Sequence, residues 1–362
     1  MNMKAVMKRE VKNYLKNPLF WVGIVVVIFG LFQILSPYLE VKYFRTEQEV
    51  KAAKPENIDD ADIMNGYVKS TEEERMDLAK NKLLSMIVKD GSADKKEVQR
   101  TLDEICSSGK SVDEISDAIG ELYGYPEGYS LHYYYMKYEY HLGTVEEINA
   151  SLKAKLSAHS YSWYFGRKFA DFGGVYLAFF SAVLLAFLFI RDTRRDTYEL
   201  LHTKPITAGA YIFGKAAGGF LSVGIVWMIL VIVFFFISLA AGIRNDLPVS
   251  LIEFLIPAVC YMLPNLLMIT SVYVIIALIF KNPLPGVPLL FLYLFYSNMG
   301  SIGPDGEFGY YGRPLAILVR FPGGFLDTAP PPMTIWNQIF LLVASAVFLF
   351  GAAAIWKRRR VY

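Results

Sequence analysis

The sequence predicts an all-α polytopic membrane protein with a mainly helical domain outside the membrane. Of the 362 residues, 54% are hydrophobic and the mean hydropathy is +0.34. That is too apolar for an ordinary soluble domain and too polar for a chain that lies wholly in lipid. Several apolar runs reach the roughly 20 residues that cross a bilayer, whereas residues 40–161 hold 24 acidic and 16 basic residues. We therefore expect membrane spans and one large water-facing part.

The first 18 residues predict a basic amphipathic helix that lies in the lipid headgroups. Apolar residues recur at steps of three and four, and basic residues fill the opposite face. The apolar residues are Met3, Val6, Met7, Val11, Tyr14 and Leu15. Asn17 and Pro18 end the helix. Because five basic residues precede the first apolar run, the amino terminus is expected in the cytoplasm.

Six apolar runs predict six transmembrane helices. They cover residues 19–37, 172–190, 216–243, 254–280, 284–299 and 335–356. Pro257 and Pro264 should kink the fourth or split it. Basic residues cluster in the segments that this order places inside, including the tail 357–362, so both termini are predicted to be cytoplasmic. The Gly/Pro-rich residues 300–334 cannot cross lipid in the open and predict an extracellular loop.

Residues 38–167 are predicted to form the extracellular domain. Three pairs with capping-box spacing predict helix starts within it, namely Thr71 and Glu74, Ser111 and Glu114, and Thr144 and Glu147. A tyrosine-rich patch comprises Tyr133, Tyr134, Tyr135, Tyr138 and Tyr140. This patch could be a strand, a packed helix face or a surface for an apolar substrate. The two cysteines, Cys106 and Cys260, lie in different environments and predict no disulfide.

The sequence contains no motif that predicts a catalytic, metal or nucleotide site. The histidines lack metal-ligand spacing, and the segment Gly209–Ala216 lacks the final hydroxyl of a phosphate-binding loop. Basic residues fall at the ends of apolar runs and form no nucleic-acid-binding face. The six predicted spans contain no Lys, Arg, Asp or Glu, which argues against an ion-coupled carrier or an intramembrane hydrolase. We therefore expect no directly bound cofactor and an external source of energy.

Residues 191–215 predict a short cytoplasmic loop that docks a partner protein. The loop carries basic residues, among them Arg194 and Arg195, beside the apolar anchors Tyr198, Leu200 and Leu201. Basic residues that only fix the orientation of the spans would explain the charges equally well.

Two segments carry a family resemblance. The start of the chain, Lys8–Trp21, and the loop resemble the type 2 ATP-binding-cassette (ABC) export permeases, in a subgroup with a large extracellular domain between the first two spans. The loop residues in this resemblance are Thr197, Glu199, Leu200, Leu201, Pro205, Gly214 and Lys215. Asp196 stands where the family often has Gly, and the large outer domain is absent from the minimal family pattern.

The resemblance implies an elbow helix, with Glu10, Asn17 and Pro18, and a coupling helix that fits a cytoplasmic ABC ATPase. It implies a second permease chain as partner, contact with membrane lipid, and ATP and Mg bound by the partner ATPase. The predicted function is the permease subunit of an exporter of an amphiphilic, peptide or lipid-like substrate. The alternative is a non-transporting receptor or assembly factor with an extracellular binding domain, in which case no ATPase should copurify.

Overall fold

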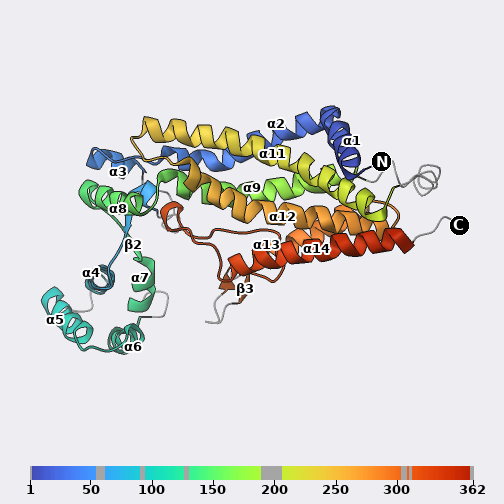
Figure 1. The fold of residues 1–362 in the computed structure, drawn as a ribbon. Coiled ribbons are helices and arrows are strands. Elements are labelled where there is room, and N and C mark those ends of the chain that lie inside the picture. Colours follow the sequence, from blue (N-terminus) through green and yellow to red (C-terminus); the bar gives the residue numbers. More distant parts are fainter. Residues whose placement is uncertain are drawn as a thin grey trace. The chain divides into compact units, whose positions relative to one another are not determined.

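The computed structural model describes residues 2–53, 62–89, 94–125, 130–188, 206–302, 308–309 and 312–358. These residues are mostly helical (Figure 1). The chain divides into two compact units. We call Met1–Lys42 with Leu156–Tyr362 the helical unit, and Tyr43–Lys155 the inserted unit.

The helical unit consists mainly of helices that run up and down. Its elements are α1 (Met3–Leu15), α2 (Pro18–Leu35), η1 (Ser36–Glu40), α9 (Tyr161–Leu185), α11 (Ala208–Arg244), α12 (Leu251–Ile279), α13 (Gly286–Asn298), β3 (Ser301–Ile302), β4 (Phe308–Gly309), η5 (Phe325–Asp327) and α14 (Thr334–Arg358). Among the described residues, five helices are long and apolar enough to cross a membrane: α2, α9, α11, α12 and α14. The fifth predicted span, residues 284–299, corresponds to α13, which is apolar but has only 13 residues.

Two of the long helices begin before the predicted spans that they contain. Helix α9 starts at Tyr161 and α11 at Ala208, whereas the predicted spans start at residues 172 and 216. The Thr207 hydroxyl accepts a hydrogen bond from the Ala210 amide and so caps α11. The last part of the predicted loop 191–215 is therefore helical.

Helix α12 continues through both of its prolines. Proline lacks an N–H group and disturbs the turn before it. In that turn the Asn265 side chain donates from Nδ2 to the Tyr261 carbonyl oxygen at 2.7 Å. The Tyr261 carbonyl oxygen thus has a side-chain donor in the turn before Pro264, and the helix is not split.

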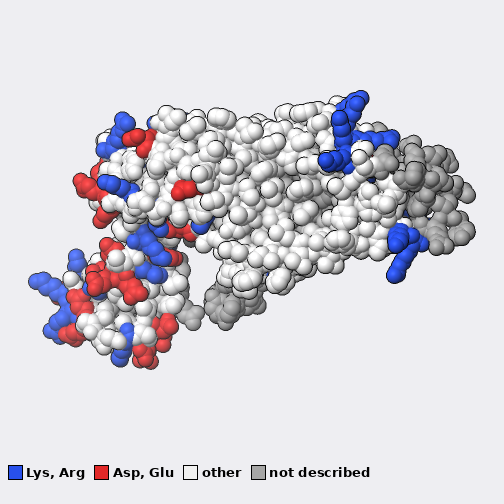
Figure 2. Space-filling model, in the orientation of Figure 1, with Lys and Arg blue, Asp and Glu red and all other residues white. Residues whose placement is uncertain are grey.

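The helical unit buries aromatic rings inside and exposes apolar side chains outside. The rings of Phe234 and Phe254 pack against Phe169 with centroids 5.5 and 5.3 Å away. Figure 2 shows that the visible face carries no Lys, Arg, Asp or Glu over the middle of its helices, and that basic side chains gather over α1 at one end. Apolar side chains exposed by more than half include Val25, Val26, Phe29, Phe236, Val343, Val347 and Phe350. A belt of this kind is stable when lipid surrounds it, which supports a multi-pass membrane protein.

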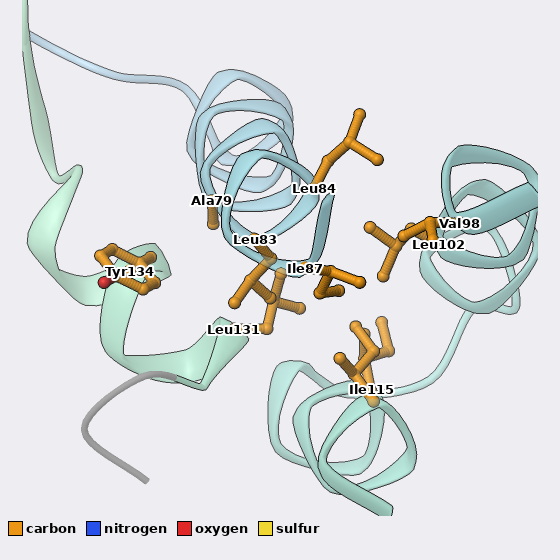
Figure 3. Packing of buried hydrophobic residues seen from close by; sticks show 10 residues of the cluster. Ala79, Leu83, Leu84, Ile87, Val98, Leu102, Ile115, Leu131 and Tyr134 are labelled. Carbon is orange, nitrogen blue, oxygen red and sulfur yellow. The ribbon is translucent and has the colours of Figure 1, made fainter. Parts of the chain in front are cut away.

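The inserted unit is built mainly from short helices. Its elements are α3 (Glu47–Ala53), η3 (Ile63–Asn65), β1 (Tyr67–Lys69), α4 (Glu72–Lys89), α5 (Lys95–Cys106), α6 (Val112–Tyr123), α7 (Leu131–Lys137), β2 (Tyr140–Leu142) and α8 (Val145–Ala158). Strands β1 and β2 pair antiparallel. Figure 3 shows the core of the unit, where Leu83 and Ile87 of α4 face Leu102, Ile115 and Leu131 from the neighbouring helices. The unit thus has a hydrophobic core of its own.

The three predicted capping boxes are confirmed. At α6 the Ser111 amide donates to Glu114 Oε2 at 3.0 Å, and the Glu114 amide donates to Ser111 Oγ at 3.3 Å. Thr71 with Glu74 and Thr144 with Glu147 form the same reciprocal pair. Each box satisfies two amides that a helix start would otherwise leave unpaired.

We predict that acid weakens the start of α6 through Glu114. The Ser111 amide and then the Ser111 hydroxyl hold the pKa of Glu114 below its ordinary value of 4.5. The stabilisation is complete above pH 4.5 and is lost as the pH falls through the lower pKa of the folded state. Hydrogen exchange of the α6 amides in the full-length protein, corrected for intrinsic rates, should show acid-dependent loss of protection. Glu114→Gln should remove that pH dependence, and equal loss in both proteins would contradict it.

Candidate functional site

Helix α1 packs closely against the beginning of α11 (Figure 1). Two glycines of α11 permit the close approach. A Cβ atom at Gly214 would lie 2.8 Å from the Val6 Cβ, and one at Gly218 would lie 2.5 Å from the Glu10 Cβ. Real Cβ atoms do not come so close, so a larger residue at either position would push α1 away. Small residues four apart are a common way for membrane helices to meet.

A buried ion pair joins the same two helices. Lys215 Nζ lies 2.8 Å from Glu10 Oε1, and the two side chains are 5% and 9% exposed. Lys215 Nζ also donates to the Leu188 carbonyl oxygen at 3.1 Å. Leu188 is the last described residue before residues 189–205, and Lys215 follows them in α11. One ammonium group therefore connects α1 to the start of α11 and to the turn that follows α9.

A second buried charged cluster lies at the opposite end of α9 and holds an irregular segment, residues 316–328, which we call the strap. Lys168 is 5% exposed. Its Nζ donates to the carbonyl oxygens of Phe321 at 3.0 Å and Gly323 at 2.9 Å. Arg167 donates to the Thr328 carbonyl oxygen. Two neighbouring cations of α9 thus bind backbone acceptors of the strap.

Asp171 completes this cluster from the next turn of α9. Its Oδ2 accepts a hydrogen bond from the Phe321 amide at 3.0 Å, and its Oδ1 lies 2.5 Å from Arg320 Nε. The latter contact is an ion pair. Asp171 is 3% exposed. The buried Lys168 and Asp171 therefore hold the strap, together with two partly exposed arginines.

The helices consequently contain buried charges that the predicted spans lacked. Lys168 and Asp171 lie inside α9, and Lys215 lies inside α11. The predicted spans exclude all three residues, because a charged residue lowers the local hydropathy and so ends an apolar run. Their partners come from distant parts of the sequence, which no local pattern reveals. Ionisable groups inside membrane helices are costly and commonly functional.

The elbow residues are all described, whereas the loop residues are not. Glu10 forms the buried pair, Asn17 Oδ1 accepts from the Leu19 amide as the cap of α2, and Pro18 is the first residue of that helix. The predicted docking residues lie within 189–205, outside the described residues. They are Arg194, Arg195, Thr197, Tyr198, Glu199, Leu200, Leu201 and Pro205.

The five tyrosines of the tyrosine-rich patch lie in different environments. Tyr134 is 6% exposed and belongs to the core of the inserted unit, and Tyr135 and Tyr138 pack against that core. Tyr140 lies in β2, whereas Tyr133 is 43% exposed on α7. Packing thus accounts for three of the five tyrosines, and a substrate-facing role stays a prediction for the patch.

The described histidines have other partners. His132 Nδ1 lies 2.6 Å from Asp113 Oδ1, His141 Nδ1 lies 2.9 Å from Ser70 Oγ, and His159 stacks on Trp163. No group of three metal-ligating side chains occurs in the parts of the chain that the structure describes.

We predict that Glu10→Ala destabilises the helical unit by about 3–5 kcal/mol, because it leaves the buried ammonium of Lys215 without its carboxylate. The double variant Glu10→Leu with Lys215→Met should recover most of that loss. The free energy of unfolding of each variant is measured in mixed micelles by titration with a denaturing detergent. Lys8→Met, at an exposed position of α1, is the matched control and should change stability by less than about 0.5 kcal/mol. A double variant as unstable as Glu10→Ala would contradict the role given to the pair.

Comparison with known proteins identifies the family. A family model described as ABC-2 family transporter protein matches residues 4–311. No curated protein and no solved structure shows significant similarity to the chain. The match runs from α1 through α13 and includes the inserted unit. The chain therefore belongs to the ABC-2 transporter family, whose members are membrane subunits of ABC transporters, normally have no ATPase site of their own and work with ABC ATPase subunits.

Proposed function

We propose that this chain is the permease subunit of an ATP-driven exporter and that separate cytoplasmic ATPase subunits power it. The partner ATPase would bind ATP and Mg. The observation that carries the proposal is the connection that Lys215 makes between α1, α11 and Leu188. A docked ATPase that displaced residues 189–205 would act on Leu188 before this segment and on α11 after it. Lys215 belongs to α11 and contacts Leu188, so both effects would meet at this connection.

The proposed docking surface consists of the residues that resemble the family's coupling helix. Arg194 and Arg195 would pair with acidic groups of the ATPase, and Tyr198, Leu200 and Leu201 would supply the apolar anchors. Interfaces commonly combine a central apolar contact with charged residues at the rim. ATP-driven closure would then move α1 together with the start of α11, because the ion pair and the two glycines join them.

The proposed topology has six spans, with both termini in the cytoplasm and residues 38–167 outside. Helix α13 is the fifth span. Its 13 residues rise about 20 Å, less than the roughly 30 Å of hydrocarbon. The flanking apolar residues Leu284 and Met299 lengthen it, and a thinner bilayer around it would accommodate the rest. The basic residues of α1 and the pair Lys357 and Arg358 then face the cytoplasm.

We further propose that two permease chains associate and that the substrate is amphiphilic, peptide or lipid-like. The exposed apolar faces of the helical unit support an association within the membrane. The exposed aromatic side chain of Tyr133 supports a substrate with an apolar part.

We predict that Leu200→Ser with Leu201→Ser separates the permease from its ATPase. Loss of two apolar anchors should weaken the association at least tenfold, or about 1.4 kcal/mol. Full-length protein purified from its own membranes should bring down an ABC ATPase, identified by mass spectrometry. The variant should bring down much less of it and should lose substrate transport in reconstituted vesicles.

The matched control is Leu122→Ser with Leu142→Ser in the inserted unit, where both leucines are exposed. This control should retain the ATPase and transport. Unchanged ATPase recovery with the loop variant would overturn the docking surface. Transport that continues without any ATPase would overturn the proposed function itself.

A further inference from the structure

A small apolar cavity lies between the start of the strap and the first turns of α14. Its volume is about 240 Å³, and its walls include Leu318, Val319, Trp336 and Phe340. Sites for drug-sized ligands usually measure about 300–1,000 Å³. The cavity therefore suits a narrower apolar group, such as a hydrocarbon chain.

Two exposed side chains of α14 line the cavity. Trp336 and Phe340, one helical turn apart, line the cavity and are 56% and 54% exposed. Val343 and Val347 continue the same face of the helix and are 58% and 61% exposed. An apolar chain can therefore enter sideways from the surrounding bilayer.

Polar groups stand beside this apolar space. Arg313 lines the cavity, donates from Nη2 to the Gly300 carbonyl oxygen at 2.6 Å and lies over the Tyr296 ring. A guanidinium has five N–H donors, and no carboxylate among the described residues forms an ion pair with Arg313. Asn337 donates from Nδ2 to the Ala316 carbonyl oxygen at 2.8 Å. Its Oδ1 is buried without a hydrogen-bond partner among the described residues.

Three prolines restrict the backbone of the cavity walls. Pro314, Pro331 and Pro332 line the cavity, and proline fixes the backbone angle φ. An incoming chain would find a formed space and would not have to order the backbone around it, which lowers the entropic cost of binding.

We propose that this cavity binds one acyl chain of an anionic phospholipid from the adjoining leaflet. Arg313 pairs with the phosphate group. This resident lipid is distinct from the exported substrate. It fills the space between the strap and α14 and holds the two together.

The test uses the full-length protein in nanodiscs and the fluorescence of Trp336. The other four tryptophans, Trp21, Trp163, Trp227 and Trp356, are replaced by phenylalanine. Phospholipids with brominated acyl chains quench a tryptophan that they contact. A brominated anionic lipid should compete for the site about fivefold better than a brominated zwitterionic lipid at equal mole fraction, since one cation near a membrane contributes about 1 kcal/mol. Bulk lipid gives only a quenching background that does not depend on the headgroup.

Two variants separate the site from general lipid contact. Arg313→Gln should reduce the preference for the anionic lipid to about equal competition. Ala316→Phe, which fills the cavity, should abolish it, whereas Val343→Phe on the lipid-facing surface below should preserve it. Equal quenching by both lipids in the parent protein would overturn the proposal. So would a preference that survives both Arg313→Gln and Ala316→Phe.

Discussion

The buried ammonium of Lys215 constrains how the segments around it can move. Removing a charge from water costs several kcal/mol, and the cost is recovered only while a carboxylate and other acceptors stay in place. Here those acceptors are Glu10 of α1 and the Leu188 carbonyl oxygen. A movement that took α1 away from α11 would leave an unpaired charge in an apolar setting. The three segments therefore favour moving as one group.

The glycines of α11 are part of the same constraint. The ion pair is short because α1 lies almost in contact with the α11 backbone at Gly214 and Gly218. A larger side chain at either position would lengthen the pair and admit water, which weakens the electrostatic attraction. Close packing and charge pairing thus depend on each other. This dependence makes the junction stiff, and a stiff junction transmits a displacement where a flexible one would absorb it.

The sequence predicts the local features of the fold well, because local patterns carry them. The reciprocal caps at Ser111 and Glu114 and the helix start at Asn17 depend on residues a few positions apart. The pair of Glu10 and Lys215 joins residues far apart in the chain, so only part of it could be foreseen. Glu10 lies on the buried stripe of α1 with Val6 and Tyr14. An acidic residue on that stripe was a signal that it needs a buried partner, although the sequence does not identify the partner.

The start of α9 shows why an apolar run and the helix that contains it begin at different residues. Lys168 and Asp171 interrupt an aromatic sequence and suggest that the helix has left the membrane. In the structure both residues lie inside the helix, where their side chains bind backbone groups of the strap. Irregular backbone cannot stay in an apolar environment unless its amide and carbonyl groups find partners. Lys168 supplies donors to two strap carbonyl oxygens, and Asp171 accepts the Phe321 amide and balances Arg320. Lys168 and Asp171 therefore occur in α9 because an irregular segment packs on this helix. The position of the strap explains why an otherwise apolar helix contains these two charged residues.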